Sequence, residues 1–227
     1  MANIPRVVLG AALALTAGAA SAAPVLIDDF DDGLYSGWTT QAGTADESGG
    51  TLGGSNMSLF TRDGLTGSSF TIEAMDAGGV SYAAIVLNYA STADNLFVKI
   101  QDNGGADGFD TVFVYSRNNS GSAASPYRYD LGTDLMNATL GVTDNGDGTI
   151  DIAVLEASFA ISVTTLTNPV GSGAGVGLGF YGGGRIDAFY AGTIDAVAVP
   201  VPASIPMLAV GLGMLGALRR RAVRPEV

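Results

Sequence analysis

The sequence predicts an all-β body folded as an antiparallel two-sheet sandwich, flanked by an N-terminal signal helix and a C-terminal transmembrane helix. Apolar residues alternate with other residues over 96–101, 150–155 and 175–180, and this period of two is typical of half-buried strands. Turn sequences rich in Asn, Asp and Gly follow such runs at 102–105 and 144–148. No stretch of the body carries a sustained helical stripe, so we expect strands throughout.

The N-terminal segment, residues 1–22, has the features of a secretory signal peptide. Arg6 and the amino terminus are positively charged, and residues 7–20 are almost all apolar. Small residues at Ala20 and Ala22 suit a signal peptidase, and we place the cleavage after Ala22, so that the body begins at residue 23.

The body, residues 23–198, is long enough for one domain with a real core. Its order of strands and turns predicts ten or more short strands, which is typical of a sandwich. Besides the three runs above, we expect strands at Val25–Phe30, Phe70–Met75, Tyr82–Tyr89, Phe109–Ser116, Ala138–Thr143, Ala160–Leu166, Ile186–Phe189 and Thr193–Val199. The segment 144–148 is predicted to be a hairpin turn rather than a calcium loop, because Thr143 and Val154 would occupy loop positions that need carboxylates.

Composition excludes several classes of chemistry. The chain contains no Cys and no His, which removes disulfides, cysteine nucleophiles, thiolate or imidazole zinc sites and every triad with a histidine base. Without the two predicted terminal segments, five basic and 21 acidic residues remain, a net charge near −16. Such a surface repels nucleic acid and anionic lipid, so neither is expected as a partner of the body.

The body resembles the concanavalin A-like and laminin G-like jelly roll. The resemblance rests on an opening Asp28–Gly33 segment followed by Gly37-Trp38, and on a closing Gly175–Tyr181 segment followed by Phe189 and a last strand, Thr193–Val199. In that family the first and last strands lie side by side. The resemblance therefore implies that Asp28 or Asp29 lies near Asp195.

A calcium ion is the one cofactor that the sequence raises. Carboxylates at Asp28, Asp29 and Asp195, with others nearby in 28–32, supply the oxygen ligands that calcium takes, and crowding them without a cation is costly. Neighbouring residues in a strand face opposite sides, however, so a solvated negative face is the alternative.

Catalysis is not expected. A glycoside hydrolase needs two carboxyl groups across the cleaved bond, and jelly-roll glucanases carry Glu-x-Asp-x-x-Glu on one strand. Here the only glutamates of the body are Glu47, Glu73 and Glu156, each isolated in the sequence. A carboxylate-dependent glycan hydrolase or lyase remains the enzymatic alternative.

Aromatic side chains are the candidate ligand contacts. Tyr127 and Tyr129 share one strand face by period two, and Trp38 is expected near a strand end, as are Tyr82 and Tyr115. Aromatic rings stack on sugar faces. The predicted binding residues are therefore Trp38, Tyr127 and Tyr129, with packing in the core as the alternative.

The C-terminal segment, residues 199–227, has the features of a short membrane anchor. Residues 205–218 carry no charge, and as a helix they would reach ~21 Å, short of a hydrocarbon core of ~30 Å. Positive charges follow this stretch and are expected on the cytoplasmic side, which agrees with a cleaved signal at the front.

This segment resembles the VPLPA-CTERM tail, a variant of the PEP-CTERM sorting signals that exosortases handle in Gram-negative bacteria. The residues that carry the resemblance are Val199, Pro200, Val201, Pro202, Ala203, Ser204, Arg219, Arg220 and Arg221. The family's Leu is Val201 here. The resemblance implies cleavage by an exosortase and release to the cell surface or extracellular matrix; an anchor that is never cut is the alternative.

Together these observations predict a non-catalytic exported protein that binds or organises extracellular polysaccharide. Its expected partners are signal peptidase and exosortase during export, the membrane transiently through the C-terminal helix, and polysaccharide afterwards. A purely structural matrix subunit is the alternative without a ligand.

Overall fold

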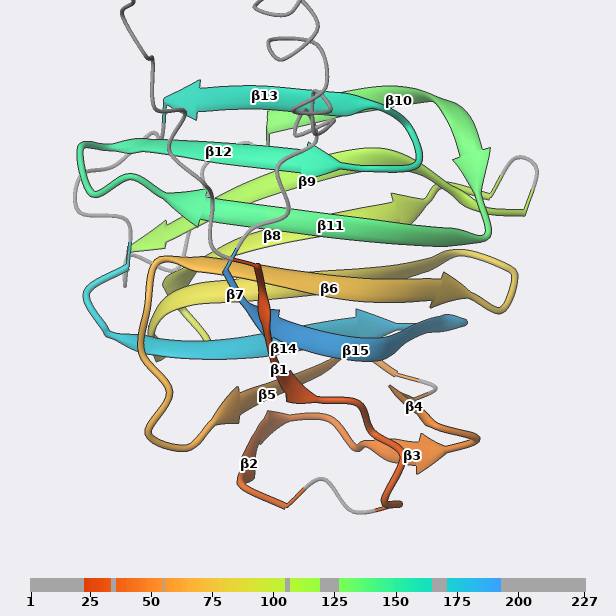
Figure 1. Cartoon of the computed structure of the whole chain (residues 1–227), viewed down its shortest axis with the longest axis horizontal. Helices are drawn as coiled ribbons and strands as arrows, with labels where there is room; N and C mark the ends of the chain where they lie inside the picture. Colours follow the sequence, from red (N-terminus) through yellow and green to blue (C-terminus); the bar gives the residue numbers. More distant parts are fainter. Residues whose placement is uncertain are drawn as a thin grey trace, which may run out of the picture.

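The computed structural model describes residues 23–33, 36–54, 56–104, 107–118, 127–164 and 171–192. These residues form two antiparallel sheets packed face to face, which confirms the predicted all-β sandwich (Figure 1). The predicted signal peptide and the whole sorting signal lie outside the described residues, as does Asp195. Within the described ranges, no helix has the length and apolar character needed to span a membrane.

The first sheet, called sheet I, faces the viewer in Figure 1. An additional short strand, β1 (Val25–Asp28), pairs with β15 (Gly184–Ala191) of this sheet. Its strands in spatial order are β13 (Phe159–Thr164), β12 (Thr149–Val154), β11 (Asn137–Asp144), β6 (Ser69–Asp76), β15 (Gly184–Ala191), β4 (Thr51–Gly53) and β3 (Asp46–Ser48).

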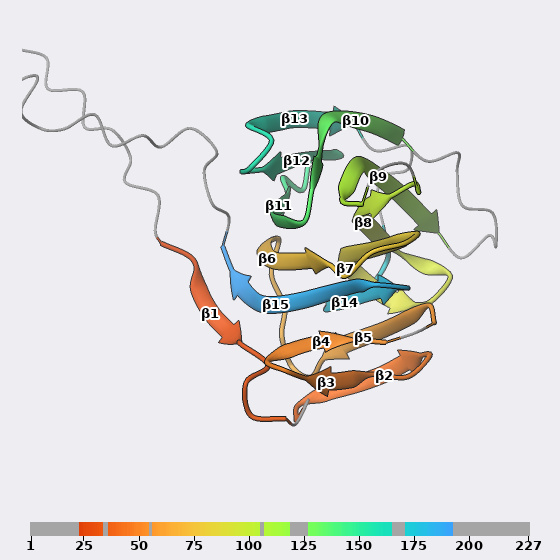
Figure 2. The ribbon, with the colours of Figure 1, turned by 90° about the vertical axis from the view of Figure 1, so that its right-hand side faces the viewer.

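The second sheet, called sheet II, lies behind sheet I, and Figure 2 shows the two layers side by side. Its strands in spatial order are β10 (Tyr127–Leu135), β9 (Phe109–Asn118), β8 (Asp94–Asp102), β7 (Ser81–Ser91), β14 (Gly175–Tyr181), β5 (Ser58–Arg62) and β2 (Trp38–Ala42).

The first described strand does pair with the last one. In the β1–β15 ladder, Val25 lies opposite Ala191 and Asp28 opposite Phe189. This agrees with the jelly-roll arrangement, in which the two ends of the body meet. The further strand expected at residues 193–199 lies outside the described residues.

The core fills the space between the sheets with one row of side chains from each strand. On β8 the inward row is Leu96, Val98 and Ile100, all with no exposed surface. Aromatic rings fill one end of the core, where the ring of Phe189 lies 5.5 Å from that of Trp38 and 5.5 Å from that of Phe70. Burial of these rows is the main source of stability for the sandwich.

The predicted turn at 144–148 is confirmed as the link between β11 and β12. Asp144 Oδ1 accepts the amide of Gly146 at 2.9 Å, and Asp147 Oδ1 accepts the amide of Thr149 at 2.9 Å. Gly146 has a φ of +73°, which a glycine adopts without strain.

Four strands between residues 38 and 62 were not expected from the sequence. These are β2 to β5, none longer than five residues. Their segment is rich in Gly, Ser and Thr, and such short runs carry too few apolar residues for a period of two to stand out.

The prediction that the strands are half-buried is wrong for the middle of sheet II. On β8 the outward-facing Asn95, Phe97 and Lys99 are also buried, with exposed fractions of 0%, 6% and 9%. Outward side chains of neighbouring strands cover one another there, since a ring or a long side chain reaches across the 4.7–4.9 Å strand spacing. The outer face of sheet II is therefore a second packed layer, and it is the first candidate site.

Candidate functional site

The outer face of sheet II gathers aromatic and cationic side chains from five adjacent strands. Cross-strand pairing explains this, because residues directly opposite each other point to the same face. The residues, which we call the aromatic face, are Tyr82 of β7, Phe97 and Lys99 of β8, Phe113, Tyr115 and Arg117 of β9, Arg128 of β10 and Tyr181 of β14.

The registers fix the neighbours on this face. Phe97 lies opposite Tyr115, and Lys99 lies opposite Phe113. Tyr82 lies opposite Tyr181, and their rings stack with centroids 5.8 Å apart. The rings of Phe97 and Tyr115 meet edge to face at 6.3 Å, one of the arrangements that aromatic pairs prefer.

Lys99 lies in a cage of three rings. Its Nζ is 4.6 Å from the centroid of Tyr82, 4.9 Å from that of Phe113 and 5.4 Å from that of Tyr115, all within cation–π range. It also donates a hydrogen bond to Oε1 of Gln101. Burial, and secondly repulsion from Arg117, lower the pKa of Lys99 from 10.5 to about 8.

Two arginines extend the cage on either side. The guanidinium of Arg117 lies 5.3 Å from the ring of Phe97 and 5.9 Å from that of Tyr115, and it donates to the carbonyl of Thr92 at 3.1 Å. The guanidinium of Arg128 lies 5.7 Å from the ring of Phe113 and is exposed.

Polar side chains border the aromatic face at the two ends of its strands. Toward β2, the Tyr89 hydroxyl donates to Gln41 at 3.1 Å, and the Gln41 amide donates to Thr61 at 2.8 Å. At the opposite border, Gln101 donates to Asn103 at 2.7 Å. Apolar rings with a small number of placed polar groups are the usual composition of a small-molecule site.

Tyr181 has the most open ring of this face, and the residue is 39% exposed. Phe113 and Tyr115 are half-buried, and Tyr82 is only 8% exposed. Burial raises the pKa of the Tyr82 phenol to about 12, so this hydroxyl stays neutral and is able to donate a hydrogen bond.

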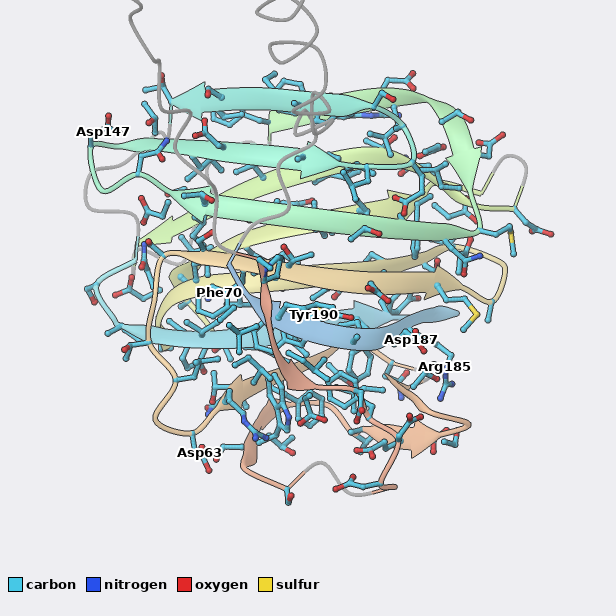
Figure 3. All side chains as sticks on the ribbon, in the orientation of Figure 1. Asp63, Phe70, Asp147, Arg185, Asp187 and Tyr190 are labelled. Carbon is cyan, nitrogen blue, oxygen red and sulfur yellow. The ribbon has the colours of Figure 1, made fainter. Side chains whose placement is uncertain are left out.

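A second candidate site lies on the outer face of sheet I. A pocket of about 270 Å³ there is lined by three carboxylates, Glu73, Glu156 and Asp187, together with Ala74, Met75, Asn137, Ala138 and Thr139. Figure 3 shows Asp187 with Tyr190 on β15, on the side turned to the viewer. Glu73 and Glu156, which are far apart in the sequence, thus come together in the fold.

Hydrogen bonds hold both glutamates of this acidic pocket. Glu73 accepts the Tyr190 hydroxyl at 2.9 Å, and Glu156 accepts the amide and the hydroxyl of Thr139, both at 2.7 Å. Burial, and secondly the bond to Glu73, raise the pKa of Tyr190 to about 12. Among the described residues, no group of three or more carboxylates has the arrangement of a metal site.

Trp38 and Asp28, predicted to bind a ligand and a metal, contact each other. The Trp38 ring is 7% exposed, and its Nε1 donates to Asp28 Oδ2 at 2.8 Å. The same oxygen lies 3.2 Å from Nη1 of Arg62, so this carboxylate already has a cation beside it. Asp29 is exposed, and Asp195 lies outside the described residues. The calcium site stays a prediction.

Tyr127 and Tyr129 share one face of β10, as their spacing predicts. That face points inward: Tyr127 lies opposite Val114 and Tyr129 opposite Val112, both core residues, and the Tyr129 ring lies 6.2 Å from that of Phe159. Both tyrosines are half-buried against the core, so their position matches the packing alternative.

The sequence pattern does not predict the aromatic face as a unit. The alternation over 96–101 predicts that Phe97 and Lys99 lie in the outward row of a half-buried strand. The signal for the site was the composition of that outward row, since aromatic and apolar residues occupy both rows of residues 82–87, and Phe97 stands in the outward row of residues 96–101. Their assembly with Phe113, Arg128 and Tyr181 depends on strand order, which the sequence pattern does not contain.

No protein-family model matches the chain, and no curated protein is significantly similar to it. Solved structures are similar in fold. A β-glucanase of Bacillus licheniformis aligns at 10% identity with a TM-score of 0.51, covering 74% of this chain and 97% of the glucanase. The carbohydrate recognition domain of Emp47p aligns at 16% identity with a TM-score of 0.50, covering 74% of this chain and 95% of that domain.

A carbohydrate-binding module of Bacillus subtilis is also similar, at 17% identity with a TM-score of 0.47, covering 68% of this chain and 91% of the module. At these identities the likeness concerns the fold. The body of this chain is thus a jelly-roll sandwich of the kind found in lectins and glucanases.

Proposed function

We propose that this chain is an exported, non-catalytic protein that binds extracellular polysaccharide on the aromatic face. The observation that carries the proposal is the ring layer of Tyr82, Phe113, Tyr115 and Tyr181 with polar side chains at its borders. Aromatic rings stack on the apolar faces of sugars, and neighbouring amides and hydroxyls donate to sugar oxygens. The fold-level likeness to a carbohydrate recognition domain supports the same reading by analogy.

The export half of the proposal rests on the two ends of the sequence. A signal peptide cut after Ala22 and a tail similar to VPLPA-CTERM would bring the body to the cell surface or matrix of a Gram-negative bacterium, through an intermediate held in the inner membrane. Mass spectrometry of the surface form tests this: we expect a chain that begins at Ala23 and lacks the residues after about Ala203. A surface form that retains Arg219–Arg221 would contradict exosortase cleavage.

Binding is tested with full-length protein on a panel of immobilised polysaccharides. Tyr181→Ala removes the most open ring of the aromatic face, and Tyr190→Ala removes a tyrosine from the opposite face as the matched control. We expect retention on at least one polysaccharide to be lost in Tyr181→Ala and kept in Tyr190→Ala. The reverse pattern would move the site to the acidic pocket.

The alternative function is a glycan hydrolase or lyase, favoured by the placement of Glu73 and Glu156 in one pocket. Incubation of the protein with the same panel of polysaccharides distinguishes binding from catalysis. Binding without new reducing ends or unsaturated products supports a lectin-like protein, whereas turnover that disappears in Glu73→Gln or Glu156→Gln supports an enzyme. A purely structural matrix subunit would show neither.

A calcium ion at Asp28, Asp29 and Asp195 remains part of the proposal as a structural cofactor. Calorimetry with calcium on chelated full-length protein tests it. Heat of binding that disappears in Asp29→Asn supports the site, and no heat together with no shift in melting temperature ends it.

A further inference from the structure

The two outer faces of the sandwich differ in charge. The pocket on sheet I is lined by Glu73, Glu156 and Asp187, with no basic residue. The aromatic face of sheet II carries Lys99, Arg117 and Arg128. The chain has a net charge of −12, and Lys99 is its only lysine. The positive charge of the aromatic face is therefore opposite in sign to the net charge of the protein.

Basic residues elsewhere in the described part of the chain already have carboxylate partners. Arg62 pairs with Asp28 at 3.2 Å, and Arg185 lies 3.9 Å from Asp46. These are the two ion pairs found among the described residues, so the three cations of the aromatic face have no carboxylate within ion-pair distance there. Asp130 is on the same face of β10 as Arg128, but it is exposed and outside that distance.

Lys99 makes this arrangement costly without a ligand. The residue is 9% exposed, and the neighbours of its ammonium group are rings, Gln101 and Arg117 rather than an acid. A buried charge needs a partner of opposite sign, and the π faces of rings attract a cation without neutralising it. A carboxylate or sulfate supplied by a ligand would complete the site.

The cations and rings alternate across the face. Phe113 lies between Lys99 and Arg128, at 4.9 and 5.7 Å from their charged groups, and Tyr115 lies between Lys99 and Arg117, at 5.4 and 5.9 Å. A sugar that lies on this ring layer therefore meets a cation over the ring of Phe113 and over that of Tyr115. The carboxylate of a uronic acid, or a sulfate ester, projects from the edge of the sugar ring toward such positions.

We infer that the aromatic face is selective for acidic polysaccharide, in which the sugar rings lie against the ring layer at Tyr181 and their anionic groups bind Lys99, Arg117 and Arg128. This inference rests on the proposed function and adds the chemical class of the ligand. The overall negative charge of the protein repels polyanions from the rest of the surface, so selectivity depends on this face.

The test compares polymers matched in backbone and different in charge. Full-length protein is titrated with polygalacturonate and with its methyl ester, and with dextran sulfate and dextran, at low and at physiological salt. We expect at least one anionic polymer to bind about tenfold more tightly than its neutral partner, the change that one charge-assisted hydrogen bond produces. Preference for polygalacturonate identifies the carboxylate, and preference for dextran sulfate identifies the sulfate.

Three variants test whether the selectivity for anionic polymers depends on the aromatic face. Arg117→Gln and Lys99→Met are expected to remove the preference, whereas Arg185→Gln removes the same charge from sheet I and should leave it intact. Equal binding of the charged and neutral polymers would overturn the inference while leaving the proposed function standing. Binding of no polysaccharide on this or a wider panel would overturn both. Melting curves of each variant show that a lost preference is not a lost fold.

Discussion

The ring of Phe97 on β8 lies directly over Gly179 on β14, although β7 separates the two strands. A Cβ atom at position 179 would come within 2.8 Å of Cε2 and 2.9 Å of Cζ of that ring. Between them lies Ala84, which pairs with both Gly179 and Lys99. Small residues on β7 and β14 thus form the floor on which the aromatic layer lies.

Gly179→Ala should displace the Phe97 ring and destabilise the protein by about 1–3 kcal/mol, the usual cost of overpacking a filled site. Residue 179 does not have a positive φ, so the added methyl group and not the backbone is responsible. Urea unfolding measures the effect. Phe97→Leu in the same chain should recover part of the loss, because a shorter side chain frees the space; strictly additive losses would contradict the contact.

Lys99 should make the protein more stable as the pH rises above 8. The pKa of Lys99 is about 8 in the folded chain and 10.5 ordinarily, so between these values the unfolded chain binds more protons than the folded one. The free energy of unfolding therefore rises with pH in that window. Tyr82 opposes this only from about pH 10, because its pKa is raised to about 12.

Urea unfolding at pH 7.5 and 9.5 checks this dependence in the wild type and in Lys99→Met, which has a similar length and no charge. The wild type should gain stability relative to the variant between the two values. The groups that face the ammonium are the rings of Tyr82, Phe113 and Tyr115, the Gln101 amide and Arg117. A parallel pH dependence in the two proteins would assign the effect to other groups.

Asp28→Asn should destabilise the end of the core where β1 meets β2. Asp28 accepts the Trp38 indole at 2.8 Å and the Phe30 amide at 3.1 Å, and it lies 3.2 Å from Arg62. Loss of the carboxylate leaves a half-buried arginine without its anion, with an expected cost of about 1–3 kcal/mol.

Trp38 is the only tryptophan of the chain, so its fluorescence reports this corner during unfolding. Asp134→Asn is the control, because Asp134 is exposed, and it should change the free energy of unfolding by less than about 0.5 kcal/mol. Similar losses in both variants would show that overall charge, and not the Trp38 contact, is responsible.

The period of two along the chain determined most of the strands and the class of fold. Residues 96–101, 150–155 and 175–180 alternate because one row of side chains must enter the core. This alternation can be recognised within each segment, so the sequence predicts these strands. The turn at 144–148 could also be predicted from the sequence, because Asn-Gly and Asp-Gly favour the backbone conformation of a tight hairpin. The weakly apolar strands between 38 and 62 form because neighbouring strands pair with them, which no local pattern contains.

The position of the candidate site and the neighbours of its residues were decided by tertiary structure. Alternation says that Tyr127 and Tyr129 share a face, but not that this face is the inner one, and it says nothing about which strands become neighbours. The aromatic face joins Tyr82 to Tyr181 and Lys99 to Phe113 through register, which is set by non-local packing of both sheets. Local sequence specifies which residues alternate, whereas the free energy of the whole sandwich specifies where each row points and what it meets.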